Sequence, residues 1–92
     1  MYTVWKDILL NSFEVQEVQL PKDAEFLCVQ NQRESACIWY RCEPVLPLKV
    51  TTRKFQIVGT GHDCPSPEEG KYLGTFQTAN GGLIWHLFER ID

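Results

Sequence analysis

The stretch KYLGTFQTANGGLIWHLFER, residues 71–90, decides the fold more than any other part of the sequence. Residues 71–78 and 83–90 are rich in aromatic, β-branched and large apolar side chains, which favour strands. Between them, residues 79–82 contain Asn80 and Gly81, and an Asn-Gly pair is the strongest short-range signal for a tight β-hairpin. This stretch therefore predicts two antiparallel strands joined by a short turn.

The second of these strands is apolar on both sides. Its alternating residues form two sets, with Leu83, Trp85 and Leu87 on one face and Ile84, His86 and Phe88 on the other. A strand of this kind is expected at the centre of a sheet and covered on both sides. Because a chain of 92 residues has little material for a second layer, we expect either a sheet that curls into a barrel with a long loop outside it, or a second subunit over the exposed face.

Towards the N-terminus the same reasoning predicts five more strands, at residues 2–10, 13–20, 25–30, 36–42 and 49–58. The polar run 31–35 should join a hairpin, and residues 43–48, with two prolines, should form an extended loop. Residues 59–70 hold three Gly and two Pro and are predicted to be irregular, with at most one helical turn near residues 66–69. We therefore predict one all-β domain, residues 1–92, of six to seven antiparallel strands in a small barrel or strongly curled sheet.

The net charge of −3 argues against a general nucleic-acid binder, because that role usually needs a basic face. The N-terminus lacks a basic start followed by an apolar run, and no apolar stretch approaches the roughly 20 residues of a membrane helix. We therefore expect a reducing cytoplasm, no membrane partner and free thiols. The four cysteines are Cys28, Cys37, Cys42 and Cys64, and no two of them form the Cys-x-x-Cys pair typical of zinc sites. We therefore interpret them as small buried hydrophobic residues and expect no cofactor.

Gly59, Thr60, Gly61 and His62 form the most suggestive local feature. A glycine-rich turn after a strand can expose consecutive backbone N–H groups that hold a phosphate or other anion, and the histidine would add a donor. The alternative is a structural turn that uses glycine for its backbone freedom. Nucleotide-binding fingerprints need a helix directly after the glycines, which the prolines at 65 and 67 oppose.

Three basic residues, Arg53, Lys54 and Arg41, are candidates to supply charge for an anionic ligand at this loop, or else form a solvated strand face. Trp85 and Trp39 are candidates to stack on a base across an oligomer interface, with burial in the core as the alternative. His86 joins the candidate site because a buried imidazole must find a partner.

A catalytic interpretation is the alternative to binding. His62 with a neighbouring acid, such as Asp63, would make a small hydrolase or nuclease. His62 and Cys64 fall short of the about four ligands that zinc needs, and a thiol catalyst also needs an oriented base. No carboxylate pair and no Ser/His/Asp arrangement stands out, so we expect no catalytic or metal-binding residues and prefer a binding function.

Several stretches together resemble small uncharacterised proteins of tailed bacteriophages and prophages. They are VWK at residues 4–6, LPKDAEFL at 20–27, CIW at 37–39, FQIVGTGH at 55–62, YLGTF at 72–76 and WHLFE at 85–89. The resemblance covers nearly the whole chain, and VGTGH and WHLFE are its most specific parts. The four cysteines depart from the family pattern.

The resemblance implies a phage accessory gene product acting in the host cytoplasm, and it carries no settled activity or site. We expect a non-enzymatic binding protein that counters host defence or modulates the host. It would bind a host protein stoichiometrically or sequester a small anionic nucleotide signal. Its small size and the apolar last strand also predict a homo-oligomer.

Overall fold

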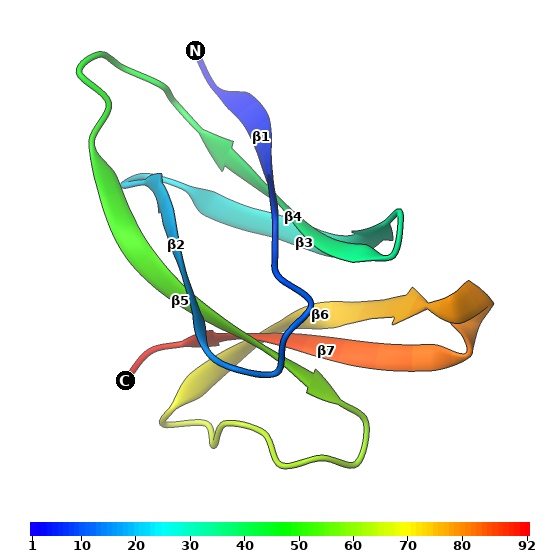
Figure 1. The fold of residues 1–92 in the computed structure, drawn as a ribbon. Coiled ribbons are helices and arrows are strands. Elements are labelled where there is room, and N and C mark those ends of the chain that lie inside the picture. The colour runs from blue at the N-terminus through cyan, green and yellow to red at the C-terminus, as the bar shows by residue number, and fades with distance from the viewer.

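The computed structural model describes residues 1–92, and nearly all of its regular structure is β-strand (Figure 1). The seven strands are β1 (Thr3–Ile8), β2 (Gln16–Pro21), β3 (Glu25–Gln32), β4 (Ser35–Cys42), β5 (Val50–Gly59), β6 (Gly70–Thr78) and β7 (Leu83–Arg90). One short 3-10 helix, η1 (Ala79–Gly81), lies between the last two strands. No helix in the structure has the length and hydropathy needed to cross a membrane.

The strands form two antiparallel sheets, one of three strands in the order β1-β4-β3 and one of four in the order β2-β5-β7-β6 (Figure 1). The prediction of an all-β fold with antiparallel strands is confirmed. The strands do not close into a barrel, because no strand of one sheet pairs with a strand of the other. The proline-containing segment after β4 carries the chain from the first sheet to the second, where β5 pairs with β2 and β7. The two sheets meet where β3 lies against β6.

The hairpin predicted from residues 71–90 is present, and β7 lies between β5 and β6 as a central strand. Leu87 and Trp85 point towards the three-stranded sheet, and Leu87 is fully buried. The predicted cover on both sides of this strand is only partial in the single chain. On its other face Ile84, His86 and Phe88 are half-buried, because residues 60–69, which connect β5 to β6, pass on that side, where Thr60 contacts His86, but no second sheet covers it.

Other boundaries differ in detail. The second strand begins at Gln16 instead of residue 13, because the Gln16 side chain bonds both to the amide and to the carbonyl of Leu10 and holds the preceding loop. Residues 66–69, where the sequence allows at most one helical turn, form a single hydrogen-bonded turn. The amide of Gly70 donates to the Ser66 carbonyl, and the Ser66 amide donates to Glu69 Oε1.

The β3–β4 hairpin has a much tighter turn than the predicted loop 31–35. Gln32 pairs with Ser35, so only Arg33 and Glu34 form the turn. Both have positive φ, 55° and 64°, as a two-residue type I′ turn requires. Asn and Gly are the usual residues there, because a Cβ atom in the left-handed region is crowded by the backbone. The hairpin therefore holds two unfavourable residues at its tip.

Replacing Arg33 with asparagine is expected to stabilise the protein. Asparagine tolerates the left-handed region better, so we expect the free energy of unfolding to rise by about 0.5–1 kcal/mol. For a domain of this size that corresponds to a melting temperature higher by roughly 2–8 °C. Thermal unfolding followed by circular dichroism measures the change, with Arg33→Lys as the control. Equal melting temperatures for the two variants would contradict the prediction.

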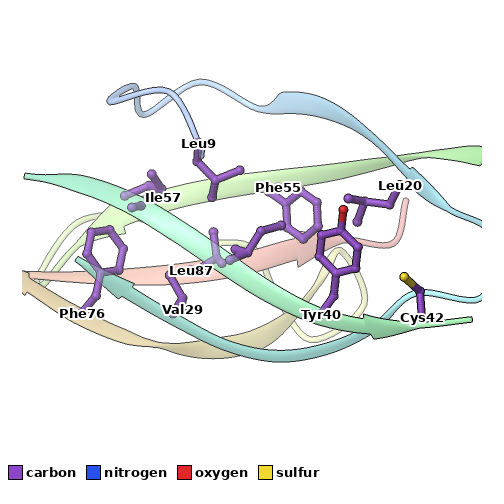
Figure 2. Close-up of a cluster of buried hydrophobic side chains, with 11 residues drawn as sticks. Leu9, Leu20, Val29, Tyr40, Cys42, Phe55, Ile57, Phe76 and Leu87 are labelled. Atoms are coloured by element: carbon purple, nitrogen blue, oxygen red, sulfur yellow. The ribbon is translucent and has the colours of Figure 1, made fainter. Parts of the chain in front are cut away.

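One hydrophobic core fills the space between the two sheets (Figure 2). Phe55 and Leu87 from the four-stranded sheet face Ile38 and Tyr40 from β4, and all four are almost completely buried. Leu9 enters the core from the segment that links β1 to β2 (Figure 2). The core therefore includes residues of both sheets and of the connection between them.

Tyr40 makes the stability depend on pH in the alkaline range. Burial and the Asp7 carboxylate, which accepts the phenol hydrogen bond at 3.1 Å, raise the pKa of Tyr40 to about 12. A raised pKa means that folding favours the neutral phenol. This contribution is complete below the ordinary pKa of 10 and is lost as the pH rises through the folded value.

Between pH 9 and pH 11 the free energy of unfolding should fall by about 1.4 kcal/mol through the ionisation of Tyr40. Urea unfolding at the two pH values measures this change. Burial also raises the pKa of the Cys42 thiol, so the wild type alone does not isolate the phenol. Tyr40→Phe removes the titrating group and should lose correspondingly less stability over the same interval. A Tyr40→Phe variant with the same alkaline loss as the wild type would count against this assignment.

Candidate functional site

A cavity of about 300 Å³ opens at one end of the sheet pair, where the β3–β4 turn, the β1–β2 connection and strands β5, β6 and β7 meet. Four hydrophobic and four polar side chains line it. The hydrophobic ones are Phe13, Ile57, Phe76 and Trp85, and the polar ones are Asn11, Ser12, Glu34 and Thr78. Small-molecule sites typically have this combination of apolar walls and a few polar groups, and this volume is at the lower end of their range.

Two of the three aromatic walls are held in fixed positions. The Trp85 indole N–H donates to the Thr78 hydroxyl at 2.8 Å, and Phe76 is buried in the core. Phe13 lies more than half exposed at the mouth, with its ring centre 5.5 Å from that of Trp85 and a tilt of 45° between the planes. The polar wall is also organised, because the Asn11 side chain donates to the Glu34 carbonyl at 3.3 Å.

The glycine loop borders this cavity. The His62 ring centre lies 6.2 Å from that of Phe13, and a Cβ atom on Gly59 would lie 3.3 Å from the Trp85 ring and 3.5 Å from His62 Nδ1. Gly61 has a φ of 87°. The two glycines therefore have backbone roles of their own: one lets the aromatic rings approach, and the other makes a left-handed turn.

Thr60 and His86 form a second cluster, on the opposite face of the four-stranded sheet. The Thr60 hydroxyl lies 2.7 Å from His86 Nε2. His86 Nδ1 lies 3.1 Å from the Tyr72 hydroxyl and 3.2 Å from the Thr75 hydroxyl, and these two hydroxyls also contact each other. Both ring nitrogens of His86 therefore have partners, as expected for a histidine that is partly buried.

The structure does not bring the basic residues to the glycine loop. Arg53 lies six residues before Gly59 on β5, about 20 Å along an extended strand. Its guanidinium makes two hydrogen bonds to Glu89, at 2.6 and 2.7 Å, and one to the Ala24 carbonyl at 2.7 Å. The hydrogen bonds to Glu89 raise the pKa of Arg53 above its already high ordinary value. This side chain is part of a partly buried ion pair that links β5 to β7.

The remaining predicted site residues are scattered. Lys54 is exposed on the outer face of β5, next to Arg90. Arg41 pairs with Glu25 on the outer face of the three-stranded sheet, and Trp39 lies on that same outer face. Of the predicted site residues, only Trp85 lines the cavity, with Gly59 and His62 next to its aromatic walls. Thr60 and His86 form the separate cluster.

Sequence reasoning missed Phe13 and Asn11. Residues 13–20 predict a strand, although Asn11 and Ser12 signal a turn that leaves the Phe13 ring outside the ladder. Glu34 lies in the polar run 31–35, which the sequence offers only as an alternative place for the site. Nothing in the sequence shows that the hairpin tip reaches the end of β6, where the Ala79 amide donates to Glu34 Oε2 at 3.1 Å.

No curated protein and no solved structure matches the chain. A model of one protein family, described as a domain of unknown function (DUF7352), matches residues 1–92. Since this match covers the whole chain, the protein belongs to the DUF7352 family.

Proposed function

We propose that this protein is a non-enzymatic binding protein and that the aromatic cavity is its binding site. The observation that carries the proposal is the cavity itself, which is preformed by Trp85, Phe76 and Phe13 and has an organised polar wall. Apolar walls supply affinity through burial, and a few fixed polar groups supply orientation. An exposed aromatic ring at the mouth is a typical anchor for a partner's side chain.

A host protein is a better target for this cavity than a nucleotide signal. Glu34 is the only charged residue that lines it, and its carboxylate would repel a phosphate group. The basic residues expected to bind an anion are engaged or distant, above all Arg53. The resemblance to phage accessory proteins supports a host-cell target, and we propose that binding counters host defence or host regulation in the cytoplasm.

The test compares two variants that each lose an exposed apolar side chain. Phe13→Ala removes one wall of the cavity, and Leu46→Ala, on the β4–β5 loop, leaves the cavity intact. A host protein that binds through this site should be captured by the wild type and by Leu46→Ala and lost with Phe13→Ala. Native mass spectrometry should then show a fixed stoichiometry and an unmodified partner. Equal capture by all three proteins, or a modified partner, would overturn the proposal.

A nucleotide signal is tested in parallel. The protein is incubated with nucleotides, separated from the excess and denatured, and the released material is analysed. Recovery of intact nucleotide at one equivalent would establish sequestration instead of protein binding.

One observation favours a small hydrolase as the second candidate. Thr60 and His86 are within hydrogen-bond distance, and Tyr72 orients the other ring nitrogen, which is the arrangement of an activated nucleophile. The geometry involves His86 instead of the His62 considered from the sequence. The test measures the rate at which the protein hydrolyses an activated ester. A rate that falls to background in both Thr60→Val and His86→Gln would support catalysis. Equal rates for the wild type and the two variants would rule out the hydrolase.

We also propose that the chain forms a homo-oligomer through the outer face of the four-stranded sheet. Ile84, Phe88 and the half-exposed Tyr72 lie on this face, which residues 60–69 cover only in part. Light scattering at micromolar protein should give a mass of at least twice 10.7 kDa. Phe88→Lys places a charge on this face and should lower the mass to that of one chain. A wild-type mass of 10.7 kDa would contradict the assembly.

A further inference from the structure

The cavity contains an unbalanced negative charge. Glu34 Oε2 accepts a hydrogen bond from the Ala79 amide at 3.1 Å, and Oε1 accepts one from the Asn31 side chain at 3.4 Å. Both donors are neutral, and none of the ion pairs in the structure includes Glu34. The carboxylate is thus held in place beside the cavity without a cation to balance it.

The opposite wall favours a cation as well. Aromatic faces attract positive charge, most strongly when the ring is an indole. Trp85 is fixed by its hydrogen bond to Thr78, and Phe13 stands beside it with its ring centre 5.5 Å away. A flat cation entering at the mouth can contact both rings and still reach the carboxylate, because all three groups line the same cavity.

The polar lining offers further acceptors. The Asn11 amide group donates to the Glu34 carbonyl, which leaves its side-chain oxygen available to accept. The Thr78 hydroxyl already accepts from the indole and has a second lone pair. A guanidinium suits this set, because it is planar, weakly hydrated and carries five N–H donors in a fixed fork.

Size points in the same direction. A volume of about 300 Å³ accommodates one long side chain more readily than a nucleotide. We propose that the cavity binds the guanidinium of one arginine side chain on the partner protein, stacked against Trp85 and Phe13 and paired with Glu34. This inference rests on the proposed function and gives it a recognition chemistry, because it identifies the group that the partner inserts.

The test uses a tripeptide, acetyl-Gly-Arg-Gly-amide, titrated into ¹⁵N-labelled protein. The readout is the Trp85 indole N–H signal, assigned by its loss in Trp85→Phe. The matched probe replaces arginine with citrulline, which has the same shape without the charge. We expect saturable shifts with the arginine peptide, at least about tenfold weaker binding of the citrulline peptide, and intermediate binding of a lysine peptide.

Two charge variants separate a local from a global effect. Glu34→Gln keeps an acceptor for the Ala79 amide and should weaken arginine binding about tenfold, which corresponds to about 1.4 kcal/mol. Glu14→Gln changes the net charge by the same amount on the β1–β2 connection, beside Phe13 but outside the cavity lining, and it should bind like the wild type. Equal binding of the arginine and citrulline peptides, or equal weakening in both variants, would overturn the inference.

The outcome is distinguishable from failure of the proposed function. A host protein lost with Phe13→Ala but not with Leu46→Ala would leave the function standing, even when no arginine peptide binds. In that case the arginine assignment alone fails. Larger shifts of the Trp85 signal with inorganic phosphate than with the arginine peptide would also overturn it, since the cavity would then select an anion.

Discussion

Leu87→Ala should destabilise the protein by about 3–5 kcal/mol, enough to remove most of the stability of a domain this small. Leu87 is fully buried at the centre of β7, the central strand of the four-stranded sheet, and belongs to the single core cluster. Truncation removes the transfer free energy of the side chain and leaves a cavity that strands on both sides prevent from collapsing. Its cross-strand partner Ile57 and the facing residues of β4 would lose contacts at once.

Leu46→Ala is the matched control, because the same atoms are removed from a side chain that is 87% exposed on the β4–β5 loop. We expect the control to stay within about 0.5 kcal/mol of the wild type. Urea unfolding followed by far-ultraviolet circular dichroism measures both variants. A difference of less than about 1 kcal/mol between them would show that the space between the sheets is not the main source of stability.

The fold was largely predictable because its signals are local. Alternating apolar residues and the Asn80-Gly81 turn predicted the β6–β7 hairpin, and the structure contains it. The division into two sheets was not predictable in the same way. It depends on which strands pair across long separations, such as β2 with β5, and periodicity within a strand does not specify a partner in another.

The candidate site was less predictable than the fold. Gly59 and His62 belong to the glycine-rich stretch that the sequence marks as a candidate site, and in the structure Gly59 lies next to both Trp85 and His62. The residues that complete the cavity come from a loop and a hairpin tip, Phe13 and Glu34, which meet only because two separate segments fold over the same end of the sheets. Arg53 shows the converse error. Because Arg53 is a basic residue on the strand that precedes the glycine loop, the sequence suggested anion binding. In the structure the Arg53 side chain lies on the core face of the sheet and is held by Glu89.

That ion pair carries the second large effect. The Arg53 and Glu89 side chains are only 21% and 16% exposed, and they join β5 to β7 through two parallel hydrogen bonds. Arg53→Met should destabilise the protein by about 2–3 kcal/mol, because it leaves the Glu89 carboxylate partly buried without a cation and the Ala24 carbonyl without its donor. A ligand-binding role alone would predict almost no change in stability.

The double variant Arg53→Met with Glu89→Leu separates two contributions to the lost stability: the loss of the attraction between the two charges, and the cost of leaving one charge buried without a partner. Removing both charges leaves neither to be desolvated alone, and apolar side chains of similar volume can pack against Phe55, whose ring centre lies 6.0 Å from the guanidinium carbon. We therefore expect the double variant to regain more than half of the stability that Arg53→Met loses, measured by urea unfolding of the wild type, both single variants and the double variant. Additive losses would mean that the two side chains stabilise the fold independently, through their packing instead of their pairing.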